Sequence, residues 1–68
     1  MQIRFYSLRG VELFARVTET IRYRCYVVYL VSLCNKIYAV LDNQAIIESN
    51  MDADINSLKL QVINELKN

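Results

Sequence analysis

Residues 11–33, VELFARVTETIRYRCYVVYLVSL, decide the fold because their apolar side chains fall on alternate positions. The alternation extends beyond this stretch: 18 of the 23 odd positions from 3 to 47 are apolar, against 10 of the 24 even positions from 2 to 48. A period of two residues belongs to β-strands, whose successive side chains point to opposite faces. We therefore expect odd-numbered side chains to form the core.

Alternation that persists through turns favours three-residue loops, because a two-residue loop would exchange odd and even positions. The best candidate is Leu8-Arg9-Gly10, which places the only glycine where such a loop needs a left-handed backbone. This loop would set Phe5 opposite Leu13. The neighbouring pair would be Arg4 opposite Phe14. Further three-residue loops are expected at residues 19–21, 34–36 and 42–44.

The C-terminal residues follow a helical period instead. Their apolar side chains fall on one stripe, formed by Ile55, Leu58, Val62 and Leu66. Asp52 or Asp54 can cap the start of this helix, and Lys67 near its end suits the helix dipole. We expect a helix over about 53–66, packed on the odd face of the sheet.

The sequence therefore predicts an α+β fold in one small domain, residues 1–68. It is a five-stranded antiparallel β-meander, either strongly curved or barrel-like, with one C-terminal amphipathic α-helix on one face. Strands are expected near residues 2–8, 11–18, 22–33, 37–41 and 45–49. An alternative stays open for residues 33–48, whose apolar residues also satisfy a helical spacing.

Part of the even face is apolar as well, and it needs a cover. The residues concerned are Val28, Leu30, Tyr38, Val40 and Ile46. A strand that is apolar on both faces is buried on both, or it leaves a patch that aggregates. We expect a second copy to cover this surface, giving a homodimer. Closure of the sheet into a small barrel is the alternative.

The composition argues against catalysis. The chain has no histidine, one glycine and two cysteines, so the usual general base, phosphate-binding loops and zinc motifs cannot form. Cys25 is expected in the core in mid-strand and Cys34 in or beside a turn. We expect a cytoplasmic, non-catalytic protein without metal, cofactor, small-molecule substrate or membrane segment. Its size would suit an accessory protein of a phage or mobile element.

The candidate binding residues are cations and aromatics of even number in the first three predicted strands. They are Arg4, Tyr6, Phe14, Arg16, Arg22, Arg24 and Tyr26. In the predicted register Arg16 faces Arg24, and such opposed like charges are stabilised by an anion between them. A second predicted pair sets Phe14 opposite Tyr26.

Three functions are consistent with this face. We favour an interaction module whose Arg- and Tyr-rich sheet face engages an acidic protein surface, because these residue types are enriched at interaction hot spots. Binding of single-stranded nucleic acid or another polyanion by the same face is the first alternative. A purely structural homo-oligomer is the second, in which these side chains are ordinary solvent-facing strand residues.

Overall fold

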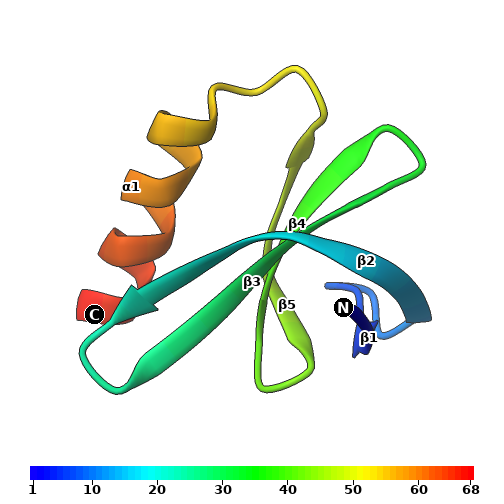
Figure 1. Cartoon of the computed structure of the whole chain (residues 1–68), viewed down its shortest axis with the longest axis horizontal. Helices are drawn as coiled ribbons and strands as arrows, with labels where there is room; N and C mark the ends of the chain where they lie inside the picture. Colours follow the sequence, from blue (N-terminus) through cyan, green and yellow to red (C-terminus); the bar gives the residue numbers. More distant parts are fainter.

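A computed structural model describes all residues from 1 to 68 and shows five strands followed by one helix (Figure 1). The elements are β1 (Gln2–Tyr6), β2 (Glu12–Tyr23), β3 (Tyr26–Leu33), β4 (Lys36–Leu41), β5 (Gln44–Asn50) and α1 (Ile55–Lys67). The predicted α+β meander with a C-terminal helix is confirmed. The helical alternative for residues 33–48 is wrong, since strands fill this stretch.

The β1–β2 hairpin has the register that the sequence predicts. Phe5 pairs with Leu13 and Arg4 with Phe14. The N–H of Ser7 donates to the carbonyl of Val11 at 2.8 Å, which encloses the three-residue loop. Gly10 adopts φ 83°, a conformation that a residue without a Cβ reaches at little cost.

The other three turns contradict the prediction, because each has two residues instead of three. The segment 19–21 is no loop: β2 continues without a break to Tyr23. The turns are Arg24–Cys25, Cys34–Asn35 and Asp42–Asn43. Both residues of the last two have positive φ, as tight hairpin turns require, and Arg24 has φ 56°. Each such turn exchanges the faces of odd and even positions. Odd-numbered residues therefore do not share one face of the sheet, and the predictions of an odd core face and of a helix packed on it are wrong.

One extra residue in β2 also reverses its faces. Val17 pairs with Val31, but the next pair is Glu19 with Leu30, so Thr18 is inserted as a β-bulge. The Thr18 hydroxyl donates to the carbonyl of Leu30 at 3.0 Å. Odd residues of β2 therefore face one side of the sheet before Thr18 and the other side after it.

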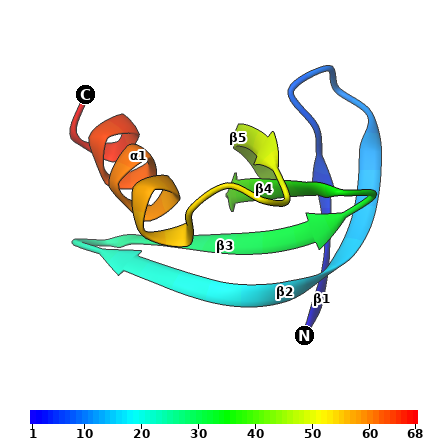
Figure 2. The ribbon, with the colours of Figure 1, turned by 90° about the horizontal axis from the view of Figure 1, so that it is seen from above.

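These reversals build two cores on opposite faces of the sheet. The barrel core lies inside the curved sheet and contains Phe5, Ala15, Val31, Tyr38, Val40 and Ala45. The helix core lies between the sheet and α1 and contains Ile21, Val28, Leu30, Ile37, Ala39, Leu58 and Val62. Figure 2 shows α1 on one side of β3 and β4 and the β1–β2 hairpin curling around the other end of the sheet. Both faces of the central strands are thus covered from within the chain.

The helix begins as predicted at one of the two aspartates. The Asp54 carboxylate accepts a hydrogen bond from the N–H of Asn56 at 3.1 Å and caps the helix. Leu58 and Val62 are its buried residues, and Lys67 lies in its last turn. α1 therefore supplies the cover for one face of the sheet.

The sheet closes into an irregular ring by a seam between β1 and β5. In a meander of five strands the first and last run parallel, and here they share one pair, Tyr6 with Gln44. The Tyr6 N–H donates to the Asn43 carbonyl at 2.9 Å. Three side-chain bonds extend the seam: Asn43 Nδ2 to Arg4 O (3.1 Å), Gln44 Nε2 to Ser7 O (3.2 Å) and Leu8 N to Glu48 Oε2 (2.6 Å). Barrel closure therefore rests largely on side chains.

Candidate interaction surface

The outer face of the β1–β2 hairpin carries four of the seven predicted binding residues. Three cross-strand pairs make up this hairpin face: Gln2 with Arg16, Arg4 with Phe14, and Tyr6 with Glu12. All six residues are exposed, whereas the alternate residues Phe5 and Ala15 belong to the barrel core. Strand alternation around the barrel core is therefore what points Arg4, Tyr6, Phe14 and Arg16 outward together.

Aromatic rings and charges of both signs meet on the hairpin face. Phe14 is 57% exposed and Tyr6 is 44% exposed. Arg4 Nε lies 3.6 Å from Glu12 Oε2, and both side chains are open to solvent, so this ion pair adds little stability. Arg16 forms no ion pair. A shallow depression lies between Arg4, Glu12, Leu13 and Phe14.

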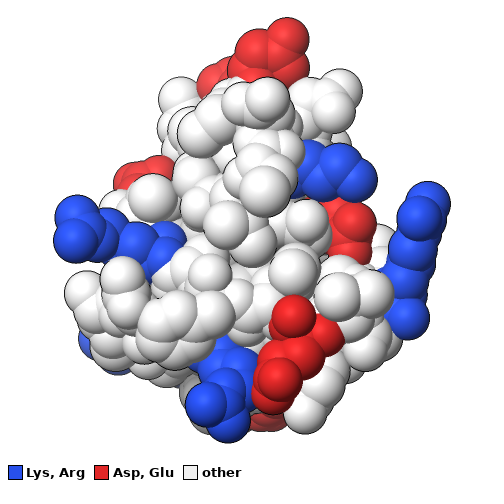
Figure 3. Space-filling view, turned by 90° about the vertical axis from the view of Figure 1, so that its right-hand side faces the viewer, with Lys and Arg blue, Asp and Glu red and all other residues white.

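Exposed apolar residues gather on this hairpin. Of the eight large hydrophobic residues that are exposed in the whole chain, five come from the first 14 residues: Met1, Tyr6, Leu8, Val11 and Phe14. Figure 3, which views the side of the molecule on which the hairpin lies, shows charged side chains mostly near the margins of this side and a broad uncharged area between them. Leu8 and Val11 were missed as surface residues. Their position beside the Gly10 turn is the signal that could have placed them at the exposed tip.

The other three predicted residues lie elsewhere, so the predicted single binding face is wrong. Arg22 pairs with Val27 beyond the Thr18 bulge, on the opposite face of the sheet from Arg16. Arg24 lies in the β2–β3 turn, with its guanidinium 5.2 Å from the centre of the Tyr23 ring. Tyr26 pairs with Tyr23 at the base of that turn. The predicted pairs of Arg16 with Arg24 and of Phe14 with Tyr26 therefore do not form.

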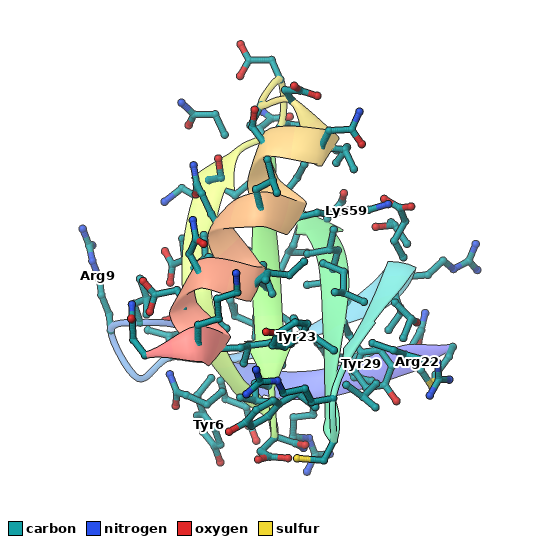
Figure 4. The ribbon with its side chains drawn as sticks, turned by 90° about the vertical axis from the view of Figure 1, so that its left-hand side faces the viewer. Tyr6, Arg9, Arg22, Tyr23, Tyr29 and Lys59 are labelled. Carbon is teal, nitrogen blue, oxygen red and sulfur yellow. The ribbon has the colours of Figure 1, made fainter.

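Figure 4 shows this separation of the cations. Arg9 projects from the β1–β2 loop at one side of the view, and Arg22 lies beside Tyr29 at the other. The Lys59 ammonium on α1 is 3.2 Å from Glu19 Oε1 on β2. No surface of the molecule collects all the arginines.

The predicted self-association surface lies inside the molecule. Val28 and Leu30 belong to the helix core, and Tyr38 and Val40 belong to the barrel core. Ile46 is half-buried against the helix core. These residues cannot meet a second copy, because β1, β2 and α1 already cover them. A dimer of this chain has to use another surface.

The two cysteines are free and exposed. Cys34 lies in a turn, as predicted. Cys25 was expected in the core, and this is wrong, because the two-residue turn places it at the tip of the β2–β3 hairpin. No three side chains of His, Cys, Asp or Glu are grouped so that they could hold a metal ion.

One titratable group stands out in the barrel core. Burial raises the pKa of the Tyr38 phenol, and electrostatic repulsion from Glu48 and Cys34 raises it further. The Tyr38 ring packs against Phe5, with ring centres 5.2 Å apart and planes tilted by 57°. This phenol is a structural member of the core and lies on the inner side of the sheet, away from the hairpin face.

No family model matches the chain, and no curated protein and no solved structure matches it. No helix in the fold has the length and apolar character needed to span a bilayer.

Proposed function

We propose that this chain is a non-catalytic interaction module that binds an acidic protein surface through the hairpin face. The observation that carries the proposal is the concentration of exposed apolar residues on the β1–β2 hairpin, beside Arg4 and Arg16. Protein interfaces have this anatomy, with aromatic and arginine anchors surrounded by a polar rim. Phe14 supplies the apolar anchor, and Arg16, which has no internal partner, attracts a carboxylate.

The mixed charge of this face favours a protein over a nucleic acid. Glu12 lies within the face and already pairs with Arg4. A nucleic-acid groove gains its affinity from many phosphate contacts by unpaired cations, and the arginines of this chain are divided among several surfaces. Single-stranded nucleic acid is therefore the second candidate.

The test is affinity capture from cells with matched surface variants. We expect a protein partner to be recovered by the wild-type chain and lost with Phe14→Ala or Arg16→Glu. The matched controls are Met51→Ala before α1 and Lys36→Glu on β4, which remove an exposed apolar residue and reverse an exposed cation away from the hairpin face. Recovery of the same proteins by the wild type and by both hairpin variants would remove the proposal.

A mobility-shift assay with a single-stranded oligonucleotide distinguishes nucleic-acid binding from protein binding. A shift that fades with rising salt and shrinks with Arg16→Glu would favour the second candidate and contradict the first.

For localisation we propose the cytoplasm, because two exposed free thiols are typical of a reducing compartment.

A further inference from the structure

The second half of β2 is an open edge of the sheet. Pairing with β1 reaches only as far as Gln2 with Arg16, and the last bond joins the Val17 N–H to the Met1 carbonyl. From Thr18 to Tyr23, β2 has β3 on one side and no strand on the other. Figure 2 shows this half of β2 at the outer margin of the molecule, with β3 along one side and no strand along the other. Such an edge is a ready template for another strand.

The register shows which backbone groups are free on this edge. Residues that flank a two-residue turn form a hydrogen-bonded pair, and pairs then alternate along an antiparallel ladder. Because Tyr23 and Tyr26 flank the turn, the N–H and C=O groups of Thr20 and Arg22 point away from β3. Their side chains are exposed too. The edge therefore offers unpaired donors and acceptors to another strand.

We propose that this edge pairs with the same edge of a second copy, antiparallel and around a two-fold axis at Thr20. In this arrangement Thr20 lies opposite Thr20 of the second copy, and Arg22 lies opposite its Thr18. The pairing joins the two sheets into one. It uses an isologous interface, the commonest form of self-association.

Charge selects this register. A two-fold axis at Ile21 would set the two Arg22 side chains diagonally across the new strand pair, and Arg22 has no acidic partner to offset the repulsion. An axis at Thr20 sets Glu19 diagonal to Glu19 of the second copy. This contact costs less because Lys59 already neutralises Glu19 at 3.2 Å. The second copy therefore fits best around Thr20.

The helices add an apolar contact on one side of the joined sheet. The two-fold axis is perpendicular to the joined sheet, so both copies of α1 lie on the same face of that sheet. Lys59 marks the side of α1 that faces β2, and Ile63 lies one turn further on the same side. Leu60, which is 63% exposed, lies next to Ile63. These residues line the flank that a second helix would approach.

The test is sedimentation of purified chain over a wide concentration range. The wild type is expected to dimerise. Thr20→Lys and Thr20→Glu each set like charges opposite across the axis and should weaken the dimer by about two- to five-fold, and more where the charges are desolvated. An equal mixture of the two variants should restore it as a heterodimer, because opposite charges then face each other. Only an axis at Thr20 predicts this rescue.

A backbone variant and two controls complete the test. Thr20→Pro removes an outward N–H, which an edge strand tolerates, and should abolish the dimer while circular dichroism shows the fold intact. Gln61→Lys on α1 should leave dimerisation unchanged. Phe14→Ala should also leave it unchanged, which separates this interface from the hairpin face. A wild type that is monomeric at millimolar concentration, or a dimer indifferent to both Thr20→Lys and Thr20→Pro, would overturn the proposal, whatever partner the hairpin face binds.

Discussion

The two halves of β2 obey opposite rules although they belong to one unbroken strand. Before Thr18, the odd residues Ala15 and Val17 face the barrel core and the even residues form the hairpin face. After Thr18, Ile21 faces the helix core and Arg22 lies on the other side. One inserted residue is enough to turn a strand over, because side chains alternate with a period of two. β2 therefore contributes side chains to both cores. Substitutions in each core test the half of β2 that faces it.

The largest loss of stability is expected from a substitution in the barrel core, which the first half of β2 faces. Phe5 is completely buried, so Phe5→Ala should cost about 3–5 kcal/mol, through lost burial and a cavity beside Tyr38. Phe14→Ala on the same hairpin is the matched control and should change stability by less than about 0.5 kcal/mol. Urea unfolding measures both. A larger cost at Phe14 than at Phe5 would mean that the hairpin faces are assigned the wrong way round, and equal costs would contradict the difference in burial between them.

The same comparison of a buried with an exposed residue applies to the helix core, which the second half of β2 faces. Leu58 is 2% exposed and packs among strand residues, so Leu58→Ala should cost about 2–5 kcal/mol. Leu60→Ala, two positions on, should stay within about 0.5 kcal/mol. If both leucines proved neutral in thermal unfolding, α1 would not be covering the sheet.

A smaller loss of stability is expected from a substitution at the seam between β1 and β5, which closes the sheet into a ring. Asn43 has φ 66° and its Nδ2 donates to the Arg4 carbonyl at 3.1 Å. Asn43→Ala strains the turn and removes this bond, at a cost of about 1–2 kcal/mol. Asn43→Gly keeps the turn relaxed and removes only the bond, so it should cost less. Chemical denaturation of the pair checks the order, and a glycine variant as unstable as the alanine variant would show that the seam depends on the bond alone.

The smallest effect is a pH dependence in the barrel core. Because burial raises the pKa of Tyr38, the folded state holds the phenol proton more tightly than the unfolded chain does. The resulting stability is fully present below about pH 10, the ordinary tyrosine pKa, and is lost as the pH rises through the folded-state pKa. Tyr38→Phe should flatten this alkaline decline in thermal midpoints, whereas Tyr6→Phe on the hairpin face should leave it. A steeper decline after Tyr38→Phe would contradict this origin.

The sequence predicted most where local chemistry was explicit. The glycine of the first turn fixed the register of β1 with β2, so Arg4, Tyr6, Phe14 and Arg16 were placed together correctly. The apolar stripe predicted the helix, and Asp54, one of its two candidate caps, starts it. The number of strands was also correct.

Prediction failed where the chain reverses its faces without a sequence signal. Arg24 adopts a positive φ that glycine or asparagine normally marks, so the turn at residues 24–25 was missed and Cys25 was placed in the core. Thr18 is a good strand residue with nothing to announce a bulge. These two errors displaced Arg22, Arg24 and Tyr26 from the predicted face. They also hid the fact that α1 covers Val28 and Leu30 and that the curled sheet covers Tyr38 and Val40.

The most direct test that the two halves of β2 point their odd-numbered side chains to opposite faces of the sheet is a pair of single-residue deletions in this strand. Deleting Thr18 removes the inserted residue, restores a regular ladder from Val17 to Glu19, and leaves Val17 and Ile21 facing their own cores. Deleting Arg22 instead, between Ile21 and the Tyr23–Tyr26 pair that flanks the turn, would move Ile21 to the place of Arg22 and out of the helix core. Both variants are compared by cooperative thermal unfolding in circular dichroism. The bulge at Thr18 predicts that the Thr18 deletion retains a cooperative transition and the Arg22 deletion loses it; two equally folded or two equally unfolded variants would contradict it.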